Sequence, residues 1–292
     1  MSDAFFQNLT DKTDYVRDYQ MDFKYFFINT LKIEEQGLDI GFDLYCTGHL
    51  IWLAAIVAAA IFMARYYRRQ KEEKKAGIKK FFAVAILCSE ILKDSILIII
   101  GAPMKGYLPL HLCGLAIFVM LWDAFGKNRK ISGQMLAYAF MPGAISALLF
   151  CNWTEYPFFN FMCIHSFAFH GWIVLYVVML YAAGEIRADY KGLWKTTGIL
   201  AVCAVPIYIL NVLIEENYLF LNEASEGSPL VFLWDIFGTR FGAPGYVASY
   251  AVLMLVVFHM LYLLYSLINK IRDNNTKRKE NTIESTTEIK EA

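Results

Sequence analysis

The sequence predicts an all-α membrane protein with seven transmembrane helices, its N-terminus outside and its C-terminus in the cytoplasm. Three observations predict this class. The 292 residues are 58% hydrophobic and only 18% charged, whereas soluble domains carry roughly 25% charged residues. Seven windows each hold the roughly 20 mostly apolar residues that a spanning helix needs. Basic residues are concentrated in alternate links between these windows.

The seven predicted spans follow one another along the middle of the chain. They cover about residues 44–66, 81–101, 108–125, 131–151, 165–184, 195–214 and 246–268. We therefore expect one membrane domain over residues 44–268. The longest link, residues 215–245, contains the apolar runs "YLFL" and "PLVFLWDIF". We expect this link to fold back over the outer mouth of the bundle as a lid.

The distribution of Lys and Arg predicts the orientation, because these residues are retained on the cytoplasmic side of a membrane. The links after spans one, three and five and the segment after span seven are basic: "RYYRRQKEEKKAGIKK", "GKNRK", "EIRADYKGLWK" and "NKIRDNNTKRK". The links after spans two, four and six hold only Lys105 and Arg240 between them. This asymmetry predicts a multi-pass protein of the cell membrane with the second set of links outside.

Two segments flank the membrane domain. Residues 1–43 form an acidic arm in which Phe23, Phe26, Phe27 and Leu31 recur at helical spacing. This spacing predicts an amphipathic helix that lies in the membrane interface. Residues 269–292 are polar with few apolar side chains, which predicts a disordered cytoplasmic tail.

Reactive side chains fall near the outer starts of the three spans that run inward. At a rise of 1.5 Å per residue, His49, Cys113 and His170 each lie about five residues, or roughly 8 Å, below the outer ends of spans one, three and five. His111 and His165 lie nearer the outer surface. Equal depth on parallel spans predicts that Cys113, His170 and His49 converge in one cavity that opens towards the outer leaflet.

Span two adds a charged stretch, "CSEILKDS", to this zone. Glu90 and Asp94 are four residues apart and share a helix face, and Lys93 lies beside Asp94. Each ionisable group at a helix centre costs roughly 2.5 to 3.5 kcal/mol on insertion scales, so such groups face the bundle interior and find partners. We expect either a polar lock between helices or a wall of the functional pocket.

The chemistry of Cys113 depends on its place in the helix. If Pro109 occupies the first turn, the thiol lies near a helix N-terminus, where the dipole favours the thiolate. Residues two apart on a helix point in nearly opposite directions, so His111 is a poor base for Cys113 unless the backbone is unwound there. The base should come from another helix. Depth favours His170 first and His49 second.

Six cysteines are scattered singly, with no CxxC pair and no paired spacing. This pattern predicts no disulfide framework. Whether Cys151 and Cys163, both in or beside the outer link after span four, form a bridge stays open.

Four stretches together resemble the signature of a known family. "GFDLYCTGHLIWL", "LPLHLCGLAIF", "HSFAFHGWIVLY" and "NYLFLNEASEGSPL" are similar to stretches of the YwaF family of integral membrane proteins, whose eukaryotic relative is transmembrane protein 164. The resemblance extends from about residue 41 to 268 and implies a fold related to membrane lipid hydrolases of the androgen-induced type. It implies that Cys113 matches the active-centre cysteine of an acyltransferase that moves fatty acyl chains between glycerophospholipids, and that His170 matches its partner histidine. Asn217 begins the last stretch, and Asn211 reaches the same outer zone from the end of span six.

The leading hypothesis is therefore thiol-based acyl transfer. A glycerophospholipid donates the acyl chain, a lyso-lipid or water accepts it, and no cofactor, metal or nucleic acid takes part. A zinc-dependent hydrolase is a second class, with ligands drawn from His49, His111, His165, His170 and Glu90 or Asp94. A transporter or small-ligand binding protein that holds its substrate near the middle of the membrane is a third.

Overall fold

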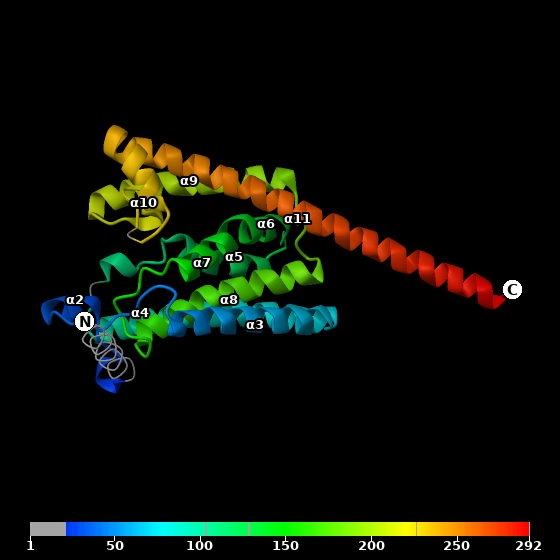
Figure 1. Cartoon of the computed structure of the whole chain (residues 1–292), viewed down its shortest axis with the longest axis horizontal. Helices are drawn as coiled ribbons and strands as arrows, with labels where there is room; N and C mark the ends of the chain where they lie inside the picture. Colours follow the sequence, from blue (N-terminus) through cyan, green and yellow to red (C-terminus); the bar gives the residue numbers. More distant parts are fainter. Residues whose placement is uncertain (1–21, 103, 128, 226, 292) are drawn as a thin grey trace, which may run out of the picture.

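The structure, a computed structural model, describes residues 22–102, 104–127, 129–225 and 227–291, with side chains as far as residue 275. All regular elements in these residues are helical (Figure 1). In chain order they are η1 (Phe23–Tyr25), α2 (Thr30–Glu35), α3 (Thr47–Arg68), α4 (Glu72–Ile99), η2 (Lys105–Tyr107), α5 (Leu112–Phe125), α6 (Arg129–Met135), η3 (Leu136–Phe140), α7 (Met141–Leu149), α8 (Phe161–Ala183), α9 (Tyr190–Ile214), η4 (Tyr218–Phe220), α10 (Leu230–Leu233), η5 (Trp234–Gly238) and α11 (Thr239–Glu291).

A helix occupies each of the seven predicted windows. Five helical segments of the described chain are long and apolar enough to cross a membrane: α3, α6 through α7, α8, α9, and α10 through α11. The other two windows differ in charge or length, because α4 carries Glu90, Lys93 and Asp94 in its apolar part and α5 has only 14 residues. The count of seven spans and the orientation of the termini therefore stay predictions.

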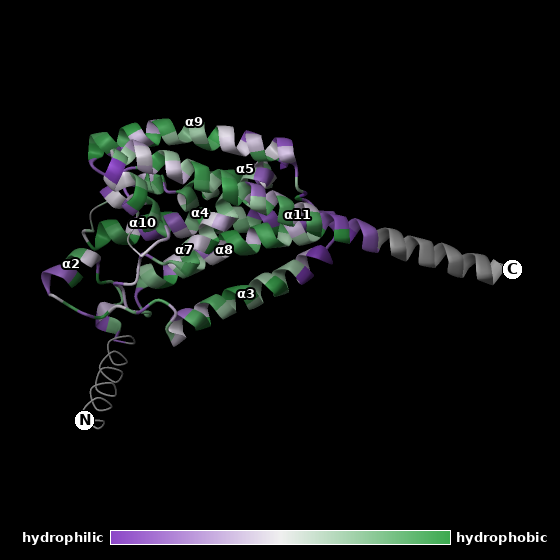
Figure 2. Ribbon diagram, turned by 45° about the horizontal axis from the view of Figure 1, so that its top comes forward, coloured by the Kyte–Doolittle hydropathy of each residue, from purple (hydrophilic) through white to green (hydrophobic). Residues whose placement is uncertain are grey.

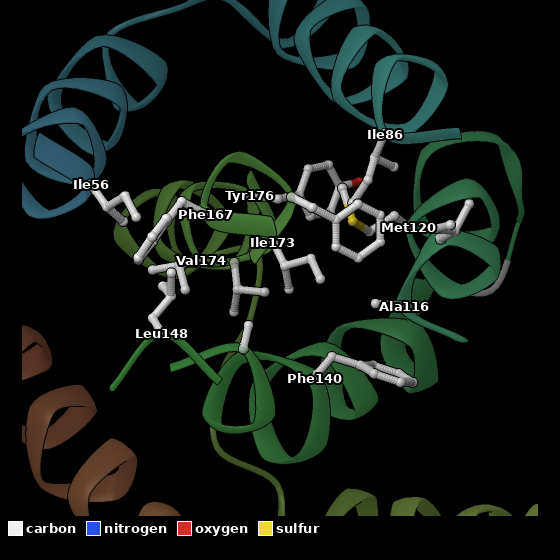
Figure 3. Close-up of a cluster of buried hydrophobic side chains, with 14 of the residues drawn as sticks. Ile56, Ile86, Ala116, Met120, Phe140, Leu148, Phe167, Ile173, Val174 and Tyr176 are labelled. Atoms are coloured by element: carbon white, nitrogen blue, oxygen red, sulfur yellow. The ribbon is translucent and has the colours of Figure 1, made fainter. Parts of the chain in front are cut away.

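Helix α8 forms the centre of the bundle. Ile56 of α3, Ile86 of α4, Met120 of α5 and Leu148 of α7 surround it (Figure 3). Gly171 lets α3 approach, since a Cβ atom at this position would lie 3.0 Å from the side chain of Ile56. The tight contact between α3 and α8 fixes His49, at the start of α3, and His170, in the middle of α8, relative to each other.

Helices α6 and α7 are joined through the π-helical turn η3. Pro142, at the start of α7, has no N–H and cannot donate to the carbonyl of Tyr138 four residues earlier. The missing bond explains the widened turn. All five residues of η3 are buried, so the turn is part of the core and not of a loop.

Helices α9 and α11 lie side by side beside this bundle (Figures 1 and 2). Only 11% of the apolar window of each is buried. Val202 and Leu213 of α9 and Met260 and Leu263 of α11 are among the most exposed apolar side chains. Figure 2 shows that α9 and the part of α11 beside it are mostly hydrophobic, as lipid contact requires, and that α11 becomes hydrophilic where it leaves the bundle.

The link over residues 215–245 divides into two parts. The first part contains η4, which packs on the segment before α5. In the second part, α10 and η5 pack against α11, where the rings of Trp234 and Tyr246 lie 5.3 Å apart. Gly242 reverses the chain between them with φ 68°. A lid over the bundle mouth stays a prediction. The part that contains η4 is the candidate for it, because it packs on the segment before α5.

The N-terminal arm contains two short helices, η1 and α2, where the spacing of its aromatic residues predicts a single amphipathic helix. Two neighbours cause the break. Asn29 caps α2, and Asn160 at the start of α8 donates to the carbonyls of Tyr25 at 2.8 Å and Ile28 at 3.1 Å. Since the side chain of Asn160 occupies these carbonyls, they do not take part in a continuous helix. Residues 1–21 lie outside the described residues.

The C-terminal segment also differs from its prediction. Helix α11 continues to Glu291 and projects beyond the bundle (Figure 1), where the composition predicts a disordered tail from residue 269. A helix that is already formed extends without a new nucleation cost. The segment contains no glycine or proline that would end it.

Candidate active site

Cys113 is the second residue of α5 and is half-buried. His111 is the N-cap residue, and its side chain makes no capping hydrogen bond. The first N–H groups of a helix have no acceptor within the helix, and the helix dipole adds partial positive charge there. The thiol therefore lies beside N–H groups that can bind an anion.

In the case considered from the sequence, Pro109 lies in the first turn of this helix, but in the structure it lies before the helix. The helix begins at Leu112, and Pro109 lies in the turn before it. This turn folds back onto the helix, since a Cβ atom on Gly114 would lie 2.7 Å from the Cα atom of Pro109. Gly114 is thus required for the close approach that covers the start of α5.

His111 has an extended backbone, with φ −67° and ψ 157°. Because His111 lies outside the helix, helix geometry does not direct its side chain away from Cys113. Its ring lies against Tyr218 and Phe220 of η4, at centroid distances of 5.1 Å and 5.2 Å. His111 is therefore a second candidate partner for the thiol.

His170 lies on α8 with one ring nitrogen fixed. Its Nδ1 atom lies 2.7 Å from the carbonyl oxygen of Ser166. Because a carbonyl only accepts, Nδ1 must carry the proton, and the lone pair of Nε2 remains available. Trp153 stacks on the ring at 5.1 Å with an interplanar angle of 14°, which holds its orientation. This is the tautomer that a general base needs.

His49 is bonded differently, although it lies at the same predicted depth. The backbone N–H of Tyr45 donates to its Nδ1 atom at 2.9 Å, so Nε2 carries the proton and donates to the carbonyl of Leu148 at 2.8 Å. The side chain is fully buried. The thiol of Cys151 lies 3.5 Å from Nε2, but a protonated Nε2 cannot remove its proton. The bonds of His49 are those of a structural residue.

Two aromatic side chains stand between His49 and His170. Phe167 contacts His49 at a centroid distance of 5.7 Å, and Trp153 contacts Phe167 at 5.3 Å and His170 on its other side. The structure thus does not bring His49 into direct contact with His170.

The charged residues of α4 form one cluster. Lys93 lies 2.6 Å from Glu90 and 3.2 Å from Asp94, and it donates to the carbonyl of Tyr107 at 3.3 Å. His165 of α8 adds its Nε2 atom at 4.0 Å from Glu90. Glu90 and Lys93 pair within α4, and their contacts with His165 and with the carbonyl of Tyr107 link α4 to α8 and to the segment before α5.

This charged cluster of α4 lies near His111 and His165. His111 and His165 are each within electrostatic range of both Lys93 and His170, while Tyr250 of α11 is within range of Cys113. His111, before α5, and His165, in the second turn of α8, therefore lie near the charged residues of α4, and His170 lies deeper, in the middle of α8. Within the described residues, no group of three or more His, Cys, Asp or Glu side chains is placed to hold a metal ion.

Asn211 fixes the segment that covers His111. Its side chain donates to the carbonyl of Tyr218 at 2.8 Å and accepts from the N–H of Tyr218 at 2.9 Å. The hydroxyl of Tyr218 donates to the carbonyl of Lys105. Asn211 is fully buried. Its two bonds tie η4 to the end of α9, and the hydroxyl of Tyr218 ties η4 to the segment before α5.

Asn217 holds the same segment in a tight turn. Its Oδ1 atom accepts from the N–H of Asn222 at 3.0 Å, and its Nδ2 atom donates to the carbonyl of Glu223 at 3.0 Å. Leu219 and Phe220 adopt left-handed conformations, with φ 58° and 54°. Such strain persists only where the surroundings impose it, and it is common at ligand clamps and switch regions.

Sequence reasoning missed Trp153 and Ser166. Trp153 lies in a link, where no periodic spacing indicates its partner. Ser166 contributes only its backbone carbonyl. Its spacing from His170 could have indicated it, because the carbonyl four residues before a helical histidine lies next to the histidine ring. Cys151 and Cys163 are both free thiols in the structure.

A comparison with protein families finds one match. The model of the TMEM164 family covers residues 44–262. Among curated proteins and among solved structures, no match to the chain was found.

Proposed function

The chain belongs to the TMEM164 family, and from this membership and its site we propose that it is a membrane lipid acyltransferase or acyl hydrolase. Cys113 is the nucleophile and His170 the base. One observation carries the proposal: His170 keeps a free Nε2 lone pair because Ser166 holds the proton on Nδ1. The substrates are a glycerophospholipid donor and a lyso-lipid acceptor, which enter sideways from the outer leaflet of the cell membrane.

The first half-reaction forms a thioester. His170 takes the proton of Cys113 as the sulfur attacks the ester carbonyl carbon of the donor lipid. The carbonyl oxygen becomes negative, and the unpaired N–H groups at the start of α5 stabilise it. When the intermediate collapses, the ester C–O bond breaks, and the leaving alkoxide takes the proton from His170 to become the lyso-lipid hydroxyl.

The second half-reaction releases the acyl chain. The acceptor hydroxyl loses its proton to His170 and attacks the thioester carbonyl, after which the C–S bond breaks and the sulfur regains the proton. A lyso-lipid acceptor gives a transferase and water gives a hydrolase. The acyl group remains activated as a thioester throughout, so the transfer needs no soluble cofactor to activate it.

His111 is the alternative base, and a specific observation favours it over His49. Its backbone is extended ahead of α5, so its ring is not directed away from Cys113 by helix geometry. His49 already uses both ring nitrogens for backbone partners. Glu90, Asp94 and His165 line the α4 side of the site and orient the surrounding segments.

Labelling with a lipid-like electrophilic ester tests the proposal. Membranes that contain the protein are treated with the probe, and mass spectrometry identifies the modified cysteine. We expect modification at Cys113, reduced strongly by His170→Ala. Modification of Cys151 at equal yield, or none at Cys113, contradicts the proposal.

A further inference from the structure

An open cavity with a mostly apolar lining lies at the other end of the bundle from Cys113. It opens between the ends of α3 and α8 and the middle of α11, and its volume is about 480 Å³. Arg68 and Arg272 are its charged residues, and Ile268 and Ile271 form part of its apolar lining. No residue of the proposed active site lines it.

Arg272 is held at the C-terminus of α8. Its Nη1 atom donates to the carbonyl of Tyr181 at 3.2 Å. The guanidinium also lies against Gly184, where a Cβ atom would come within 2.7 Å of Nη2. Gly184 has φ 79°, which favours glycine and leaves space for the guanidinium. Arg272 is therefore fixed with its charge at the cavity.

Arg68 brings a second positive charge that no acidic side chain neutralises in the described part of the chain. Two acidic residues at this end of the bundle are already paired with other cations. Glu185 lies 2.8 Å from Lys79, and Asp273 lies 3.2 Å from Arg187. Arg68 thus contributes a positive charge to the cavity that no described acidic side chain neutralises.

We propose that this cavity binds the phosphate group of an anionic phospholipid. Guanidinium groups match the geometry of phosphate oxygens and form charge-assisted hydrogen bonds with them. Ile268 and Ile271 are exposed to 39% and 52%, so they offer apolar surface to the acyl chains. The basic links lie at this end, and the cytoplasmic leaflet that attracts such links is rich in anionic lipids.

The bound headgroup links α3 and α8 to α11. Helix α9 and helix α11 pack loosely on the rest of the bundle, so a lipid that bridges Arg68 and Arg272 stabilises their arrangement. This inference does not depend on the chemistry of Cys113.

Native mass spectrometry of the purified full-length protein tests it. The protein is mixed with phosphatidylglycerol or phosphatidylcholine, and bound lipid is counted. Arg68→Gln removes one charge-assisted contact, and we expect roughly tenfold weaker retention of phosphatidylglycerol, because hydrogen bonds to charged groups are stronger than those between neutral groups. Arg69→Gln is the matched control, because it removes the same charge from the adjacent exposed residue outside the cavity. Arg272→Lys gives a second, more conservative test at the other arginine.

Equal retention by Arg68→Gln and Arg69→Gln overturns the inference, as does equally tight binding of phosphatidylcholine. A further arm adds inorganic phosphate. If phosphate displaces the lipid, and its own binding shows the same dependence on Arg68, the ligand is soluble phosphate and the lipid assignment is wrong. Acyl transfer is not measured in any arm, so failure here is distinct from failure of the proposed enzyme.

Discussion

The Nδ1 atom of His170 lies 2.7 Å from the carbonyl oxygen of Ser166, and this hydrogen bond keeps the imidazole proton on Nδ1. His49, at the same predicted depth, has the opposite tautomer and both nitrogens engaged. Two histidines that the sequence places at one depth, with His170 ranked before His49, therefore differ in what they can do. One has a free lone pair, and the other forms two backbone bonds in the core.

Loss of the thiol should abolish acyl transfer. Cys113→Ser replaces the sulfur with a hydroxyl that is a much weaker nucleophile at neutral pH, and His170→Ala removes the proposed base. We expect each variant to lose activity by at least about 100-fold, the lower range of a general base contribution. Activity is measured with a labelled phospholipid donor in reconstituted membranes.

A matched control comes from the remaining thiols. Cys203→Ser changes a cysteine on α9 that contacts none of the site histidines among the described interactions, and we expect full activity. Cys113→Ser protein that retains wild-type turnover would exclude a thiol mechanism at this position.

The sequence predicts the position of these residues along the membrane normal but not their bonds. Apolar windows predict the helices, and a fixed rise per residue predicts one common depth for His49, Cys113 and His170. That common depth stays a prediction, since the three residues are the third, second and tenth of their helices. The tautomers depend on backbone groups such as the carbonyl of Leu148, which is distant in the chain from His49. No local pattern contains that information.

A polar network in the other half of the bundle was likewise not predicted. Asp123 is 3% exposed and accepts hydrogen bonds from Ser132 at 3.0 Å and Tyr176 at 2.8 Å. These three residues come from different helices, and each looks unremarkable in its own apolar segment. Their convergence follows from helix packing around α8, which the order of spans does not determine.

Removal of the His49 side chain should lower stability and leave chemistry intact. His49→Ala removes the partner of the Tyr45 N–H and leaves the carbonyl of Leu148 with only the weak thiol donor of Cys151. A lost buried hydrogen bond of this kind costs about 1–3 kcal/mol. We expect a lower thermal unfolding midpoint in detergent, with unchanged specific activity of the folded fraction. An unchanged midpoint together with lost activity would assign His49 a catalytic role.

Release of the η4 segment should expose the site. Asn211→Ala removes both bonds to the backbone of Tyr218, and Asn211→Asp removes only the bond that needs an N–H donor. We expect faster proteolysis of residues 215–223 in both variants, more in the alanine variant. Asn274→Ala, at an exposed position on α11, serves as the control. Equal protease resistance in all variants would show that Asn211 does not hold the segment.

Metal removal distinguishes thiol chemistry from zinc chemistry. We expect the purified protein to contain no stoichiometric zinc and to keep its activity after treatment with a chelator. His111→Ala should then leave the metal content unchanged. If activity disappears with a chelator, returns with zinc and survives Cys113→Ser, the hydrolase is metal-dependent.

The orientation of the chain is testable with single introduced cysteines and a membrane-impermeant maleimide. Glu73 is exposed at the start of α4 in a basic link, and Glu223 is exposed in the link after α9. Because basic links are retained in the cytoplasm, Glu223→Cys should react in intact cells and Glu73→Cys only after the membrane is opened. The unmodified protein supplies the background from its native cysteines. Reaction of Glu73→Cys in intact cells, or protease cleavage from outside within residues 70–78, would reverse the topology. The site around Cys113 would then face the cytoplasmic leaflet, and the substrates would have to enter from that side.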